Sequence, residues 1–177
     1  MNTKFLLPVV ALLACLTVTP AHATSKASCC SAPTTMTPTQ FAQTVATIDM
    51  LEIKLGQVAQ TNSNSAAVKK FGQRMIIDHT NINKNLTSVT ASQHITIPTK
   101  LDAKHQAIVK KLSGLKGSAF NNAYIPAMVT GHTQALAMFK NQSTTCANAA
   151  LKKFARQTTP IIALHLKLAK AVHAGLK

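Results

Sequence analysis

Apolar residues recur along this chain at steps of three and four positions, which is the spacing of one face of an α-helix. The two clearest stripes lie in segments 38–61 and 147–174, and similar stripes follow 65–92 and 118–142. The first two stripes consist of Phe41, Val45, Ile48, Glu52, Leu55 and Ala59, and of Leu151, Phe154, Thr158, Ile161, His165, Leu168 and Val172. No segment shows the strict alternation of a half-buried strand. The pattern therefore predicts four long helices and an all-α fold.

The first helix has a clear start, because Thr37 precedes Pro38 and is followed three residues later by Gln40. This combination is a capping box with proline at the first helical position. A polar turn over 61–65 leads to the second helix. In the last helix, Pro160 should either kink the chain or mark the first turn.

A longer connection separates the second and third long helices. Segment 93–99 reads as a loop, and Thr99 with Asp102 three residues later can cap a short helix over 100–114. Gly114 then favours its end. Two short turns and one such connection predict an antiparallel four-helix bundle with a short extra helix in the crossover between helices two and three.

The N-terminal residues resemble an export signal rather than part of the fold. Segment 1–23 has a positive start, an apolar run over 5–18 and a small-residue cleavage site ending at Ala23. We expect a mature chain with a tether over 24–37, a bundle over 38–174 and no transmembrane span. A lipid-anchored form through Cys15 is the alternative. Either form would be exported to the periplasm or outer envelope.

Charge is strongly unbalanced, with 19 Lys+Arg against 4 Asp+Glu and a formal net charge of +15. In the cytosol such a balance would suggest nucleic acid, but export argues against that partner. Two interpretations remain open: the lysines solvate the outer faces of helices, or they attract anionic envelope polymers or lipid headgroups.

Three cysteines would remain after signal removal, namely Cys29, Cys30 and Cys146. An oxidising compartment permits a disulfide between the tether and the loop that contains Cys146. The odd count also permits pairing between molecules.

Ionisable residues occupy inward positions on all four apolar stripes. They are Glu52, Asp78, His79, His132 and His165. Such groups are costly in a core unless they are paired, hydrogen-bonded or metal-bound. Imidazole and carboxylate together suit one Zn, Fe, Cu or Mn ion. The chain has no Glu-x-x-His motif and too few carboxylates for an ordinary di-iron site.

A purely structural polar network, with Glu52 paired to His79, explains the same pattern. Predicted turn positions place Glu52 and His79 roughly 7 Å apart along the bundle, and His132 and His165 roughly 12 Å apart. Asp49 lies one turn before Glu52 and either pairs with a lysine or extends the polar layer. The remaining histidines, His94, His105 and His173, are expected at the surface.

Several segments resemble a bacterial family of exported ferritin-like proteins catalogued as domain of unknown function 4142, often labelled "predicted outer membrane protein". They are Leu51–Gly56, Val68–Thr80, Ile97–Thr99, Phe120–Tyr124, Gly131–His132, Thr159–Pro160 and His165. The resemblance covers about residues 38–173 and implies a ferritin-like bundle in the envelope, without an activity. Family members tend to carry Asp where this chain has Asn121, and are usually less basic.

We therefore expect an exported binding protein that holds one transition-metal ion, with a role in envelope stress or metal handling. The alternative is a structural or interaction module whose cationic surface engages anionic envelope polymers or lipids. We identify no catalytic residue, because the chain has neither a G-x-S-x-G motif nor a Walker-type loop.

Overall fold

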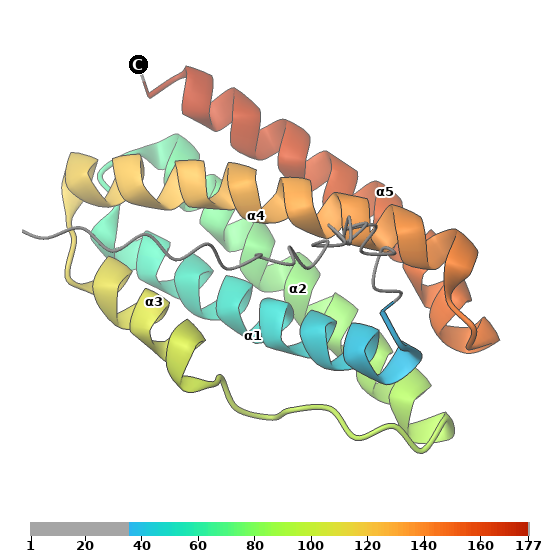
Figure 1. Cartoon of the computed structure of the whole chain (residues 1–177). Coiled ribbons are helices and arrows are strands. Elements are labelled where there is room, and N and C mark those ends of the chain that lie inside the picture. Colours follow the sequence, from blue (N-terminus) through green and yellow to red (C-terminus); the bar gives the residue numbers. More distant parts are fainter. Residues whose placement is uncertain (1–35, 177) are drawn as a thin grey trace, which may run out of the picture. The chain divides into compact units, whose positions relative to one another are not determined.

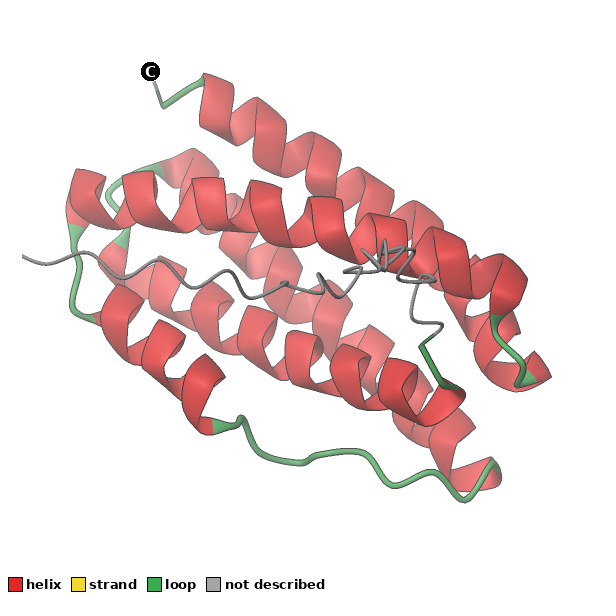
Figure 2. Ribbon diagram, viewed as in Figure 1, coloured by secondary structure: helices red, strands yellow, loops and turns green. Residues whose placement is uncertain are grey.

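The computed structural model describes residues 36–176, which form five helices. They are α1 (Pro38–Asn62), α2 (Ala66–Ser92), α3 (Ala103–Ser113), α4 (Gly117–Thr145) and α5 (Ala149–Ala174) (Figure 1). Within this part of the chain no strand is present (Figure 2), which confirms the predicted all-α class. The expected signal peptide and most of the tether, with Cys15, Cys29 and Cys30, lie outside the described residues.

Four long helices form two antiparallel hairpins, α1 with α2 and α4 with α5. The hairpins pack on each other mainly through α2 and α5, whereas α1 and α4 touch at few points. The short helix α3 lies along α1 (Figure 1). This is the four-helix bundle with an extra crossover helix that the sequence predicts. None of the described helices combines the length and apolar character needed to cross a membrane.

The structure confirms the predicted cap at the start of α1 and differs from the prediction at two other helix ends. Thr37 and Gln40 form the expected capping box at the start of α1. The predicted start of α3 is wrong: the helix begins at Ala103 because the Asp102 carboxylate accepts a hydrogen bond from the His105 backbone N–H at 2.9 Å. The third long helix ends at Thr145 rather than near residue 142.

The last helix, α5, differs from the prediction in the place of its proline and in part of its buried face. Pro160 lies inside α5, which begins at Ala149, so the proline does not mark a first turn. Asn148 caps that first turn by accepting a hydrogen bond from the Leu151 backbone N–H at 3.0 Å. The buried face of α5 also passes through Ile162 and Ala169, whereas Ile161 is only partly buried.

Two glycines let α1 and α2 approach unusually closely. A Cβ on Gly56 would lie 2.6 Å from the backbone oxygen of Gly72, and a Cβ on Gly72 would lie 2.8 Å from the Cβ of Ala59. Any larger residue would force the backbones apart. This close contact sets the spacing at which an acidic side chain of α1 reaches a histidine of α2.

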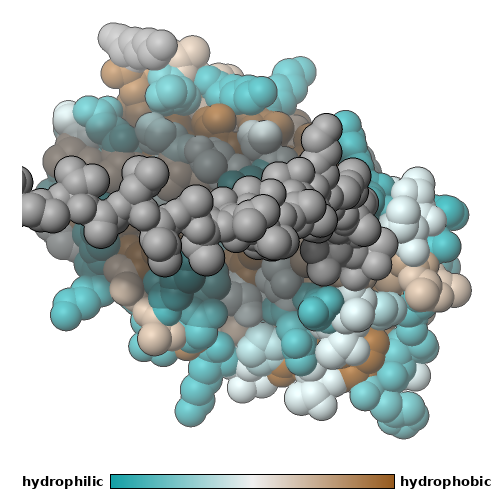
Figure 3. Space-filling view, viewed as in Figure 1, coloured by the Kyte–Doolittle hydropathy of each residue, from teal (hydrophilic) through white to brown (hydrophobic). Residues whose placement is uncertain are grey.

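Two apolar clusters fill the bundle, one at each end. The first is built around Phe41, Phe139 and Phe154, and the second around Phe71 and Phe120. A layer of buried ionisable side chains lies between them: Asp49, Glu52, His79, His132 and His165. On the face shown in Figure 3, hydrophilic side chains project over much of the coloured surface, with hydrophobic ones among them. The polar layer, enclosed by two apolar ones, is where a functional site is to be sought.

Candidate metal centre

Three histidines from three different helices meet in the polar layer. His79 comes from α2, His132 from α4 and His165 from α5, and their side chains are almost completely buried. One ring nitrogen of each lies within 4.8 Å of the corresponding nitrogen of the other two. The ring centroids are 5.2 Å (His79–His165), 5.4 Å (His132–His165) and 5.8 Å (His79–His132) apart. The three rings thus surround one point.

Each imidazole also has one ring nitrogen within hydrogen-bond distance of an oxygen of the protein. His132 Nδ1 lies 2.9 Å from the carbonyl oxygen of Met128, and because a carbonyl only accepts, this nitrogen carries the proton. His79 Nδ1 lies 2.8 Å from Asp49 Oδ1, and His165 Nε2 lies 2.8 Å from Asp78 Oδ2. Ionised carboxylates in these positions accept the ring N–H, as in carboxylate–histidine–metal arrangements.

The ring nitrogens not engaged in these contacts are His79 Nε2, His132 Nε2 and His165 Nδ1. All three are buried and have no hydrogen-bond partner among residues 36–176. Where the carboxylates and the Met128 carbonyl accept the ring N–H, each of these three nitrogens keeps a free lone pair. Three free lone pairs on buried, neighbouring imidazoles constitute an arrangement that a cation would satisfy.

Burial keeps two of these imidazoles neutral at physiological pH. Desolvation lowers the pKa of His79 to about 4; the proximity of His132 adds to this, while Glu52 and Asp78 oppose it. Desolvation likewise lowers the pKa of His165 to about 4, with His79 and His132 adding to the effect and the Asp78 hydrogen bond opposing it. Neutral imidazole is the form that binds a metal.

Asp49 behaves differently, because burial raises the pKa of its carboxyl well above the usual range. A positive ion on the far side of His79 would favour the ionised carboxylate, since opposite charges stabilise each other in a poorly solvated interior. Asp49 and a bound cation would therefore support each other through the imidazole.

The spacing of the three nitrogens suits one ion. Atoms at most 4.8 Å apart surround a point no more than about 2.8 Å from each, compared with roughly 2.1 Å for a zinc–imidazole bond. Side-chain movements of well under about 1 Å would close this difference. The donor set and its backing groups thus fit a transition-metal ion.

Of the five site residues expected from the sequence, three form the cluster, one contacts a cluster histidine and one lies apart. His79, His132 and His165 form the cluster. Asp78 lies outside it and accepts from His165 while Arg74 Nη1 contacts the same oxygen at 3.2 Å. Glu52 is buried but lies outside the group of three nitrogens, and its Oε2 has no hydrogen-bond partner within the described part of the chain.

The expected pairing of Glu52 with His79 is wrong, because Asp49 occupies that position. Of the two alternatives for Asp49, the structure shows that it extends the polar layer. It contacts His79 rather than a lysine. Counting residues from the α1–α2 turn would have identified Asp49 as the partner of His79. It lies 15 residues before Asn64, the middle of the α1–α2 turn, and His79 lies 15 residues after it. Glu52 is closer to the turn and therefore reaches a different level.

The predicted 12 Å offset between His132 and His165 is also wrong. The cause is the misplaced turn: its middle is Ala147, which lies 15 residues after His132 and 18 before His165. Among the other histidines, His94 is exposed as expected, whereas His105 and His173 are partly buried.

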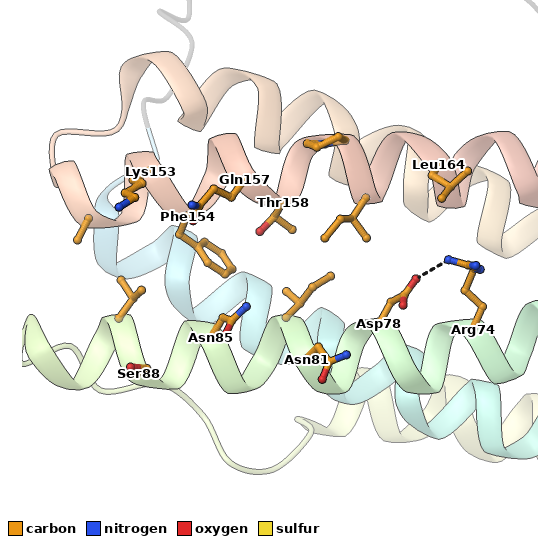
Figure 4. A pocket seen from close by; sticks show the side chains of 15 residues that line it. Arg74, Asp78, Asn81, Asn85, Ser88, Lys153, Phe154, Gln157, Thr158 and Leu164 are labelled. Carbon is orange, nitrogen blue, oxygen red and sulfur yellow. Dashed lines mark hydrogen bonds and ion pairs between the residues drawn. The ribbon is translucent and has the colours of Figure 1, made fainter.

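Two grooves separate the hairpins, one on each side of the cluster. The groove between α2 and α5, about 780 Å³, contains Asp78, Arg74, Lys153 and Gln157 (Figure 4). The cavity between α1 and α4, also about 780 Å³, is mostly apolar and reaches Glu52, His79 and His132. The grooves differ in character, since the first is bordered by polar and charged side chains.

A family model described as a domain of unknown function, DUF4142, matches residues 23–172. The chain belongs to this family. The match spans all four long helices almost completely and includes the three clustered histidines. It confirms the resemblance seen in the sequence, and the function of the family is unknown.

Among solved structures, the bundle is similar to a DUF305 protein from Streptomyces coelicolor that is described as secreted. The two are 14% identical with a TM-score of 0.65, and the match covers 79% of this chain and 94% of the other. At this identity the likeness concerns the fold alone, and it agrees with the predicted helical bundle. No curated protein matches the chain.

Proposed function

We propose that this protein is an exported bacterial envelope protein that binds one transition-metal ion through His79, His132 and His165. The observation that carries the proposal is the convergence of three buried imidazole nitrogens without partners among residues 36–176. An all-imidazole set suits Zn, Cu and Fe better than Mg or Ca. We extend the proposal to a role in metal handling in the envelope.

A structural polar network accounts less well for this geometry. A network stabilises a core when its members satisfy one another, whereas here the hydrogen bonds point outward from the three rings. Each buried polar atom left without a partner costs about 1–3 kcal/mol. A cation would compensate three such costs at once, and the two backing carboxylates would offset its charge.

Calorimetric titration of the purified, tag-free protein with Zn²⁺ and Cu²⁺ tests the proposal. We expect binding near one ion per chain, lost in His132→Gln. His105→Gln is the matched control, because His105 contacts Asp102 outside the cluster. Wild-type protein that is folded yet binds neither ion, nor Fe²⁺ or Mn²⁺, would reduce the cluster to a core polar network.

Export is supported by the signal-like residues 1–23 and by the secreted description of the DUF305 neighbour. Mass spectrometry of protein from the native host tests it. A mature chain that begins near Thr24 is expected, and a diacylglyceryl group on Cys15 would instead establish the lipid-anchored alternative. Full-length protein in the cytosol would contradict export.

A second function rests on the distribution of acidic residues. All four acids are engaged locally: Asp49 and Glu52 are buried, Asp78 contacts His165 and Arg74, and Asp102 caps α3. Among the described cations, only Arg74 has an acidic partner within 4 Å, if histidines are left aside. The outer surface is therefore almost purely cationic and suits anionic envelope polymers or lipid headgroups.

Binding to vesicles with and without anionic lipid distinguishes this second function. Lys110→Glu with Lys111→Glu, on the exposed face of α3, should weaken binding to anionic vesicles at low salt and leave metal uptake unchanged. Equal binding of both proteins to both kinds of vesicle would argue that the lysines only solvate the helices.

A further inference from the structure

The histidine cluster is incomplete on one side of the bundle. Its three residues come from α2, α4 and α5, while α1, the fourth long helix, contributes Asp49 behind His79 and the separate Glu52. The described residues offer no fourth nitrogen, sulfur or carboxylate within the same group. A metal with three protein ligands keeps a coordination position for an external molecule.

The side facing α1 opens into the cavity between α1 and α4. His79, His132, Asp49 and Glu52 border this cavity, whereas His165 does not. Its volume of about 780 Å³ lies in the range of small-molecule sites. The apolar part of its wall includes Val45, Leu55, Met128, Ala135, Phe139 and Ile162. An occupant would thus have an apolar body.

Two further residues define what fits. Glu52 is 5% exposed, and its Oε2 has no hydrogen-bond partner in the described part of the chain, so it can accept a bond from an O–H or N–H. Gly131 also lines the cavity, and a Cβ built there would have no atom within 4 Å. The space beside His132 is therefore open rather than packed.

We infer that the α1–α4 cavity is a binding site for a small organic ligand with an apolar body and an oxygen head group. The head group would donate a lone pair to the ion on His79, His132 and His165 and a hydrogen bond to Glu52. The ligand class is thus an apolar molecule whose oxygen head group also carries a hydroxyl or N–H, and a hydroxamic acid is a suitable probe for it. This inference rests on the proposed metal binding.

The test compares benzohydroxamate with acetohydroxamate by calorimetry on the zinc-loaded protein. Both have the same head group, and only benzohydroxamate has a body that would occupy the cavity. We expect benzohydroxamate to bind at least about tenfold more tightly, because its phenyl ring would be removed from water when it enters the cavity. Equal affinities would overturn the inference.

Variants locate the site. Gly131→Leu should remove the advantage of benzohydroxamate while zinc binding stays near one per chain, and Glu52→Gln should weaken both hydroxamates. Leu164→Ala is the matched control, because Leu164 borders the other groove and is 42% exposed. Retention of the full advantage by folded Gly131→Leu would place the ligand elsewhere.

Amide chemical shifts of the zinc-loaded wild-type chain give a second measurement that needs no variant. Benzohydroxamate should shift the amides of Glu52 and Gly131 and leave those of Asn85 and Gln157, in the α2–α5 groove, unchanged. The reverse pattern would contradict the assignment. Failure to take up zinc would instead refute the metal site itself, so the two ideas fail in different ways.

Discussion

At the scale of single residues, the site depends on which partner each imidazole has. Asp49, Asp78 and the Met128 carbonyl each contact one ring nitrogen, and this leaves the other nitrogen of each ring directed into the bundle. The sequence identified the three histidines because each interrupts an apolar stripe. It did not single out Asp49 as a site residue, because Asp49 lies beside the predicted stripe of its helix rather than within it.

Asp49→Asn tests the backing interaction. The amide keeps the shape of the side chain but loses the negative charge that supports a cation through His79. We expect zinc affinity to fall by about 10–100-fold, as measured by competition with a chromophoric chelator. Asp102→Asn is the matched control, since Asp102 caps α3 and contacts His105 outside the cluster, and it should leave the affinity unchanged. Equal affinities in wild type and Asp49→Asn would exclude a supporting role.

The stability of the metal-free protein should depend on pH through His165. Burial lowers the pKa of His165 to about 4, against 6.5 in the unfolded chain, so between these values only the unfolded state is protonated. The part of the free energy of unfolding that depends on neutral His165 is therefore fully present above pH 6.5 and is lost as the pH falls toward 4. The raised pKa of Asp49 acts in the opposite direction, so the contribution of His165 must be isolated by a variant.

Urea unfolding in chelator at pH 7 and pH 4.5 provides that comparison. Wild type should lose roughly 2 kcal/mol more than His165→Gln between the two pH values. Equal losses in the two proteins would show that His165 is not held neutral by burial.

At the scale of helices, the levels of the site residues follow from where the turns lie. Most helix ends could be predicted within three residues, because caps such as Thr37 are local signals. An error of a few residues in the α4–α5 turn was nevertheless enough to place His132 and His165 too far apart. Each residue adds about 1.5 Å along a helix, so small boundary errors accumulate into large errors in a site.

Replacing glycine by alanine should lower the stability at the α1–α2 contact and raise it at an open position of α4. Gly56→Ala and Gly72→Ala should each lower the free energy of unfolding by about 1–3 kcal/mol, because the new Cβ meets atoms of the neighbouring helix. Gly131→Ala should raise it by up to about 1 kcal/mol, since alanine favours helix and open space surrounds the position. Thermal and urea unfolding measure all three, and stabilisation by Gly72→Ala would contradict the close packing.

At the scale of the whole molecule, the bundle could be predicted from the stripes, but the neighbours of each helix could not. An apolar stripe shows that a helix is buried without saying which helix covers it. That α2 packs on α5 more extensively than α1 on α4 decides where the two grooves lie. The α1–α4 cavity beside the histidines follows from this packing alone, and no local motif indicates it.

Metal binding should stabilise the entire bundle, because the three ligands belong to three helices. A ligand that binds only the folded state adds about 2.7 kcal/mol at 100 times its dissociation constant. The melting temperature of wild type should therefore rise with added zinc, whereas that of His132→Gln should not. A rise of equal size in both proteins would assign the effect to surface binding.

The most direct test of the metal centre is native mass spectrometry of the mature chain, purified without an affinity tag and titrated with zinc, beside the variant His79→Gln/His165→Gln. One ion per wild-type chain and none in the folded variant is the predicted result. An equal zinc load in the two proteins, or a folded wild-type chain that takes up no zinc, copper, iron or manganese, would contradict the histidine site.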